Sequence, residues 1–187
     1  DNVDSITNQN AITYGVDNFF DTLSQNGSRA TYATLELEQS YDLRSSASDE
    51  PFGDIYGKLS WKLMRGSSLI YKTYYDVYDS DFNAHTFESY FSDSRGDSFS
   101  LDYSKKEAQD IDQINATLHA NLINGWSLDG KIEHSISQDE TVEAKGSFTY
   151  QALCWSVKFE TSYTPGDTTF LVLFRLANIG VPFGVSM

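Results

Sequence analysis

The side chains that could hold a metal ion are few and scattered along the sequence. The three histidines, His85, His119 and His134, have none of the short spacings that bring two ligands to one metal. Two acidic stretches, Asp76–Asp81 and Asp93–Asp97, could offer carboxylate oxygens to a divalent cation, but neither has the spacing of a calcium-binding loop. We therefore expect no metal site, and we interpret the acidic stretches as turns with hydrated carboxylates.

Charged side chains also occur inside segments that are apolar at every second residue. Two carboxylates at a suitable separation can hydrolyse a glycosidic bond. Here, however, lysines share the alternate positions with the carboxylates, as in Lys131 and Glu133. We therefore expect a wet face of mixed charge and no catalytic residue. The residues expected on this face of the C-terminal half are Asn115, Thr117, His119, Asp129, Lys131, Glu133, Glu143, Lys145, Lys158 and Glu160.

The composition excludes several classes of protein. The 187 residues include 27 acidic and 13 basic side chains, for a formal charge of −14, which argues against nucleic-acid binding because phosphate contacts need clustered lysine and arginine. The single cysteine, Cys154, cannot form an internal disulfide. No apolar run is long enough for a transmembrane helix. No motif indicates a cofactor.

The charged side chains lie in segments in which apolar and polar residues alternate with a period of two. From Gln113 to Leu122 the even-numbered residues are apolar and the odd-numbered ones polar, and the segment from Trp126 to Ser137 continues the pattern. Asn124-Gly125 between them is a strong signal for a tight hairpin. A helix would need apolar residues three and four positions apart, which these segments lack. The pattern predicts antiparallel strands with two faces of different polarity.

The same pattern over the whole chain predicts about eleven strands and no helix. Glycines in Arg65-Gly66-Ser67, Arg95-Gly96-Asp97 and Pro165-Gly166-Asp167 support tight turns between them. The predicted strands are 10–22, 30–43, 52–63, 68–78, 82–92, 98–106, 111–122, 126–137, 141–151, 154–163 and 168–176.

Strand length and the charged face favour an all-β, antiparallel transmembrane barrel over a soluble sandwich. A tilted strand needs roughly 9–11 residues to cross a bilayer, whereas soluble strands average about 5–6. Trp61, Trp126 and Trp155 fall at strand ends on the apolar face, which is typical of an aromatic belt at a membrane interface. If the last strand ends on the periplasmic side, all three belong to the periplasmic belt.

An odd number of strands indicates a fragment of a larger outer-membrane barrel. Single-chain bacterial barrels have even strand counts, and an unpaired edge in lipid is very unfavourable. We expect residues 1–9 to be the remnant of an extracellular loop, 10–176 the C-terminal strands of the barrel, and 177–187 a periplasmic tail. The number of upstream strands, and closure by a partner chain instead, stay open.

One segment near the C terminus resembles a known family. Tyr150-Gln151-Ala152-Leu153-Cys154-Trp155-Ser156-Val157-Lys158 is similar to the segment with adjacent cysteines and a tryptophan in the lipopolysaccharide-assembly family LptD (OstA/Imp). The segments 111–114 and 124–128 resemble the two strands before it, Asn10–Val16 an earlier strand, and Thr168–Leu176 the last strand. The similarity in pattern covers nearly the whole chain, but only the Cys-Trp segment is specific.

The resemblance implies a transport component of the bacterial outer membrane and not an enzyme. In that family a barrel of about twenty-six strands is plugged by a lipoprotein of the LptE type. A periplasmic domain in front of the barrel receives lipopolysaccharide from an LptA-type bridge. The lipid then passes the hydrated barrel and leaves through a lateral gate into the outer leaflet. The gate strand would contain Thr169, Phe170, Leu171, Val172, Leu173, Phe174, Arg175 and Leu176.

The cysteine departs from the family pattern. Family members often have two adjacent cysteines bonded to others near the N terminus, whereas here Leu153 precedes Cys154. The resemblance makes Cys154 a candidate for one interdomain disulfide, and a free thiol is the alternative. For the whole chain, the alternatives are a diffusion porin or small structural barrel, and a secreted soluble β-protein.

Overall fold

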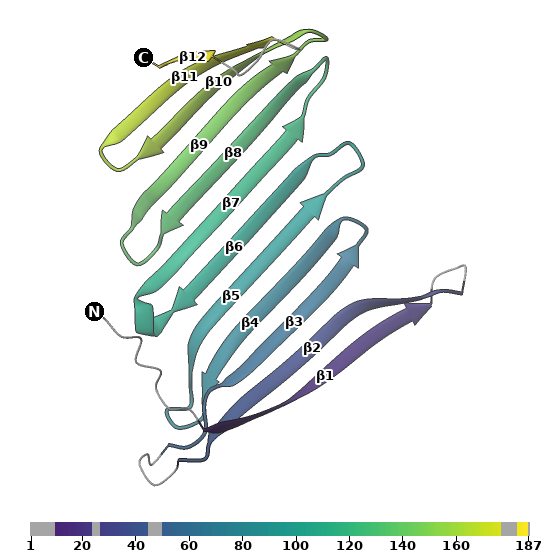
Figure 1. Cartoon of the computed structure of the whole chain (residues 1–187), viewed down its shortest axis with the longest axis vertical. Helices are drawn as coiled ribbons and strands as arrows, with labels where there is room; N and C mark the ends of the chain where they lie inside the picture. Colours follow the sequence, from purple (N-terminus) through teal and green to yellow (C-terminus); the bar gives the residue numbers. More distant parts are fainter. Residues whose placement is uncertain (1–9, 24–26, 45–49, 177–182, 187) are drawn as a thin grey trace.

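The chain forms one antiparallel sheet of twelve strands that pair in sequence order (Figure 1). The computed structural model describes residues 10–23, 27–44, 50–176 and the backbone of 183–186. The strands are β1 (Ala11–Leu23), β2 (Arg29–Asp42), β3 (Ile55–Met64), β4 (Ser67–Asp76), β5 (Asp81–Ser92), β6 (Ser98–Lys106), β7 (Ile111–Asn121), β8 (Trp126–Ser135), β9 (Glu140–Gln151), β10 (Trp155–Thr164), β11 (Asp167–Leu176) and β12 (Phe183–Ser186).

Each of the eleven predicted strands is present, and the prediction of an all-β antiparallel sheet is confirmed. The 3-10 turn η1 (Glu107–Gln109) is the single helical element in the described part of the chain. Within the described ranges, no helix has the length and apolar character of a membrane span. The hairpin pattern therefore accounts for nearly all of the fold.

The C-terminal region differs from the expectation, because Phe183–Ser186 forms the short strand β12 and pairs with Leu171–Phe174 of β11. Four residues are too few for an alternating pattern to be recognised in the sequence. The expected loop remnant at 1–9 lies outside the described residues, as do 177–182 and 187 of the expected tail.

The sheet is curved and open in the described residues, with β1 and β12 at opposite edges (Figure 1). Its residues are poorly buried, and Ala33 is the one buried apolar residue among those described. A soluble sandwich would bury one face of each sheet against the other. The large apolar side chains of this sheet have no second protein layer over them in the described part of the chain.

Turn glycines hold the hairpins in the expected places. Asn124 and Gly125 join β7 to β8 with φ values of 57° and 80°, the left-handed region that a two-residue hairpin turn of this kind requires. A Cβ atom on Gly125 would collide with the backbone oxygen of Gln151 in the neighbouring hairpin. Glycine is therefore needed here for both its conformation and the close approach of the next turn.

Candidate functional site

Strand register brings all ten of the predicted wet-face residues to one face of β7–β10. In the pairing of β7 with β8, Asn115 stands opposite Glu133, and Thr117 opposite Lys131. In the pairing of β8 with β9, the same face continues because Lys131 stands opposite Lys145. We call this the polar face, and the opposite side of the sheet the apolar face.

The polar face carries a network of ion pairs instead of isolated charges. Glu143 binds two lysines, since its carboxylate contacts Lys131 and lies 2.6 Å from the Nζ atom of Lys145. Lys131 is also 3.6 Å from Glu133. The two glutamates stand opposite each other in the β8–β9 register, and Lys131 contacts both of them. A network of this kind does not resemble the acid and base of a glycosidase.

His119, Asp129 and Ser147 form a hydrogen-bonded group on the polar face. The Nδ1 atom of His119 is 2.6 Å from one carboxylate oxygen of Asp129, and the Ser147 hydroxyl donates to the other at 3.1 Å. In a hydrolase triad the serine bonds to the histidine and the carboxylate lies behind it. Here the carboxylate lies in the middle, so the arrangement orients side chains and does not activate the serine.

The N-terminal half of the sheet has ion pairs on the same face that were not among the predicted site residues. Lys58 of β3 binds Glu36 of β2 at 2.9 Å, and Lys72 of β4 binds Glu88 of β5 at 2.6 Å. The alternating charges were visible in the sequence, but the partners depend on the register. Lys72 stands opposite Thr86, and its contact with Glu88 is diagonal.

A hollow of about 240 Å³ opens on the polar face of β8–β10. Three rows of side chains surround it, where a row consists of residues that stand opposite one another in β8, β9 and β10. The small, buried Ser147 lies in the middle row. The glycines Gly130 and Gly146 add backbone to its floor. Its lining is Asp129, Gly130, Lys131, Lys145, Gly146, Ser147, Lys158 and Glu160.

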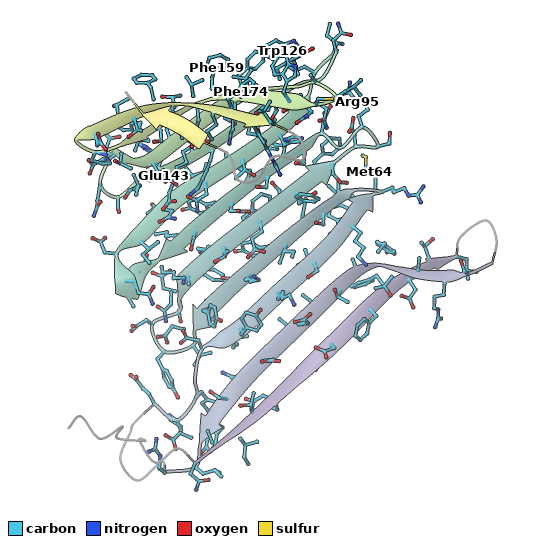
Figure 2. All side chains as sticks on the ribbon, turned by 45° about the horizontal axis from the view of Figure 1, so that its top comes forward. Met64, Arg95, Trp126, Glu143, Phe159 and Phe174 are labelled. Carbon is cyan, nitrogen blue, oxygen red and sulfur yellow. The ribbon has the colours of Figure 1, made fainter. Side chains whose placement is uncertain are left out.

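The apolar face carries the aromatic side chains, and Figure 2 shows Trp126 and Phe159 on the side of the curved sheet opposite Glu143. The Trp126 ring lies 4.4 Å from Phe148 and 4.7 Å from Tyr150, centroid to centroid. The Trp155 ring extends this line of rings, at 5.2 Å from Tyr150 and 5.9 Å from Phe174. We call these five rings the aromatic row. The register places all three predicted tryptophans on this face, and Trp61 lies apart in β3.

The predicted gate strand, β11, is paired on both sides over part of its length. β10 pairs along the whole of β11, whereas β12 covers only Leu171–Phe174. Thr169, Leu171, Leu173 and Arg175 follow the polar face, and Phe170, Val172, Phe174 and Leu176 follow the apolar face. Leu171 and Leu173 therefore give this strand an apolar segment on the otherwise polar side.

Cys154 lies in the turn between β9 and β10 as an exposed free thiol. Leu153, beside it, is 99% exposed. The two residues line a hollow of about 620 Å³ between this turn and the Asn124-Gly125 turn. The structure thus places the cysteine at one rim of the sheet, next to an unusually exposed leucine.

The acidic stretch Asp93–Asp97 forms the turn between β5 and β6, and its carboxylates are occupied by protein groups. The Arg95 guanidinium binds both Asp93, at 2.9 Å, and Asp97. The hydrogen bond from the Arg95 side chain to Asp93 lowers the pKa of Asp93, and the backbone N–H groups of Arg95 and Asp97 lower this pKa further. No group of three or more potential metal ligands occurs among the described residues.

One comparison with known proteins identifies a family. The family model LptD, described as LPS transport system D, matches residues 1–119, which is more than half of the chain. The match does not extend to the Tyr150–Lys158 segment on which the resemblance was most specific. No curated protein matches the chain.

Proposed function

The chain belongs to the LptD family, LPS transport system D, and on this basis we propose that it is part of the outer-membrane translocon that inserts lipopolysaccharide into the outer leaflet. The family match carries this proposal. In it, the chain supplies C-terminal strands of a larger barrel, has no enzymatic role, and contacts outer-membrane lipids. Lipopolysaccharide is the cargo, and the location is the bacterial outer membrane.

In this proposal the polar face lines a hydrated lumen. Partly exposed ion pairs such as Lys58 with Glu36 are weak in water-accessible surroundings, but they keep charged groups paired on a surface that must stay wet. The sugars of lipopolysaccharide are polar and need such a surface. The apolar face, which has no covering layer in the described residues, then faces the lipid chains.

The proposed exit is a seam at the end of the sheet, formed by β11 and β12. Between strands, backbone hydrogen bonds must break before a lipid can pass sideways. β11 and β12 share a register of four residue pairs, from Leu171 with Ser186 to Phe174 with Phe183, against ten between β10 and β11. A shorter ladder of backbone hydrogen bonds requires less free energy to open. This proposal therefore assigns the lateral gate to β11 and β12 together.

The proposal gives the aromatic row and Cys154 roles at the periplasmic rim. Trp126 and Trp155 are large rings with a polar N–H, which suits the interface between lipid and water. An exposed thiol at that rim could form a disulfide with a periplasmic domain, which in turn would meet an LptA-type bridge. An LptE-type lipoprotein would plug the lumen. These partners come from the family and not from contacts of this chain.

Depletion of the parent protein in its source bacterium tests the proposal. Newly made lipopolysaccharide is followed with a label that reacts only at the cell surface, and assembly of unrelated outer-membrane barrels serves as the control. We expect surface arrival of lipopolysaccharide to stop while the other barrels still assemble. Unchanged arrival would contradict the proposal, and ion conductance of the purified protein would then favour a porin.

A further inference from the structure

We propose that the apolar face of β8–β11 holds one resident zwitterionic phospholipid, with its head group in the hollow at the rim and an acyl chain in a groove nearer the middle of the sheet. This inference rests on the proposed function, because it takes the apolar face to lie in the membrane. It goes beyond that function, since this lipid is a fixed part of the wall and not the transported glycolipid.

The groove is a depression of about 400 Å³ among aromatic rings on the apolar face. Its floor is formed by Gly146 and Thr161, which stand opposite each other in β9 and β10. Phe148 and Phe159, the next pair on the same face, form one wall, and Phe170 of β11 forms another. Small residues between large rings thus leave an apolar channel, which suits a flexible hydrocarbon chain.

The rings that border the groove are exposed although they are large and apolar. Phe159 is 48% exposed and Phe170 is 58% exposed. No protein layer covers them in the described part of the chain. An acyl chain in the groove would remove apolar surface of both rings from contact with other solvent, and burial of such surface is favourable roughly in proportion to its area.

The rim hollow, of about 620 Å³, is the second half of the proposed site. Tyr150 and Trp155 of the aromatic row line it, together with Asn124 and Gly125 of the β7–β8 turn. These side chains supply a hydroxyl, an indole N–H and an amide, which are hydrogen-bond donors and acceptors of the kind that a lipid head group needs. A tryptophan and a tyrosine are also typical of the depth at which head groups lie.

The charge of the rim hollow distinguishes one class of lipid from others. None of the described residues that line it is an aspartate, glutamate, lysine or arginine. A phosphorylated glycolipid or another anionic lipid would lack a cation here. A zwitterionic head group carries its own ammonium beside its phosphate and is neutral as a whole, so it matches an uncharged site.

The spacing of the two hollows matches one leaflet of a membrane. Gly146 in the groove and Tyr150 at the rim are four residues apart in β9, which is about 13 Å along the strand and less in depth when the strand is tilted. One leaflet takes half of a hydrocarbon core of about 30 Å. A lipid with its head group at the rim therefore reaches the groove with its acyl chain.

Stacked rings connect the two hollows without a break. The Phe148 ring, which lines the groove, lies 4.4 Å from the Trp126 ring. Trp126 in turn lies 4.7 Å from Tyr150, which lines the rim hollow. Figure 2 shows Trp126 and Phe159 on the same side of the sheet. The path from head group to chain end is therefore apolar and lies on one face.

Native mass spectrometry of the purified full-length parent protein, released from detergent after removal of bound lipid, tests the site. The probes are zwitterionic phosphatidylethanolamine, anionic phosphatidylglycerol and the phosphorylated glycolipid lipid A. Gly146→Val fills the groove, and its Cβ would meet only Thr161, at 3.7 Å, an ordinary contact. Gly57→Val is the matched control, since a Cβ on this strand glycine also makes ordinary contacts, at 3.5 Å, and Gly57 lines neither hollow.

We expect the first phosphatidylethanolamine to bind wild type about tenfold more tightly than either other lipid, and Gly146→Val to weaken this binding about tenfold because the chain loses burial in the groove. Gly57→Val should bind like wild type, and gel migration before and after heating verifies that both variants are folded. Equal affinity for the three lipids, an equal loss in the two variants, or no binding to wild type would each overturn the inference.

Leu153→Lys tests the head-group position separately. Leu153 lines the rim hollow and is almost completely exposed, so the substitution disturbs no packing. The added ammonium should reverse the preference in favour of phosphatidylglycerol, and an unchanged preference would overturn the assignment of the head group to this rim. The depletion experiment reads a different quantity. Lost delivery without lipid binding would leave the proposed function intact, whereas lipid binding with unchanged delivery would contradict only the proposed function.

Discussion

The carboxylate of Asp97 accepts the backbone N–H of Asn121 at 2.6 Å, and this bond joins two turns at the same rim of the sheet. Asp97 closes the turn between β5 and β6, whereas Asn121 ends β7. The Asn121 side chain completes the connection by donating to the backbone oxygen of Arg95 at 2.9 Å. The hairpins β5–β6 and β7–β8, which follow each other in the chain, are thus also held together at their tips.

Replacing Asp97 with alanine should loosen this connection. The Asn121 N–H would lose a charged acceptor, and we expect the free energy of unfolding to fall by about 1 kcal/mol, because the site is partly exposed. Urea unfolding of the purified protein in detergent measures the loss, and hydrogen exchange at Asn121 should become faster. Asp97→Asn, which retains an acceptor oxygen, is the control; an equal loss in that variant would argue against this hydrogen bond as the cause.

The turn should also weaken in acid. Arg95 lowers the pKa of Asp93, so the ionised carboxylate stabilises the turn above the unfolded-state pKa of about 3.9, and this contribution is lost as the pH falls through the lower, folded-state pKa. The amides of Arg95 and Asp97 donate to Asp93 at 2.9 and 3.0 Å. Their protection from hydrogen exchange should drop below about pH 4. Constant protection down to pH 2, or the same drop in Asp93→Asn, would refute the assignment.

Two turn glycines separate the effect of backbone conformation from that of crowding. Gly27 and Gly125 both have a φ of 80°, but a Cβ on Gly27 meets nothing within 4 Å. Gly27→Ala should cost about 1 kcal/mol, from the left-handed conformation alone. Gly125→Ala should cost more, because its methyl group also meets the backbone of Gln151. The two variants are heated in steps and run on a gel, on which folded and unfolded protein migrate differently. The temperature at which half of the folded band is lost compares their stabilities, and equal temperatures would contradict the crowding argument.

The aromatic row predicts unequal roles for two tryptophans. Trp126 contacts the rings of Phe148 and Tyr150, whereas Trp61 packs against no aromatic ring among the described residues. An aromatic pair adds about 0.5–1.5 kcal/mol beyond burial. Trp126→Leu should therefore lower the free energy of unfolding more than Trp61→Leu, by about 1–2 kcal/mol. Urea unfolding in lipid nanodiscs measures both, and a larger loss at Trp61 would reverse the prediction.

A disulfide across the proposed seam tests its opening. Val172 and Val185 are register partners in β11 and β12, and antiparallel partners have Cα separations of about 4.5–5.5 Å, within the range for a disulfide. With Cys154 changed to serine, Val172→Cys and Val185→Cys together should crosslink under oxidation and stop surface delivery of lipopolysaccharide, and a reductant should restore it. A crosslink between Phe159→Cys and Val172→Cys in β10 and β11 is the control and should leave delivery unchanged. Full delivery with the β11–β12 crosslink formed would place the exit elsewhere.

Local pattern was sufficient for most of the fold. Alternation and turn glycines located eleven strands, since each hairpin is specified by neighbours in sequence and by residues such as Gly125 that adopt positive φ. β12 was missed because four residues carry too little periodicity. Its position depends on the edge of β11, which is a property of the assembled sheet.

The placement of the charged residues on one face of the sheet was predictable for a related reason. A period of two fixes which side of a strand each residue occupies, so Lys131, Glu143 and Lys158 could be assigned to one face without knowing their neighbours. Which carboxylate each lysine binds was not predictable. Lys131 reaches Glu143 across the β8–β9 register, and Lys72 reaches Glu88 along a diagonal.

By itself, the sequence determined the all-β class, the hairpin order, the two faces and the family resemblance, because these depend on residue type and spacing along one chain. Only the tertiary structure decided the sharing of Glu143 between two lysines, the hollow above Ser147, and the bond from Asp97 to Asn121. Each of these depends on the register between strands, where a shift of one residue would send every side chain of a strand to the other face.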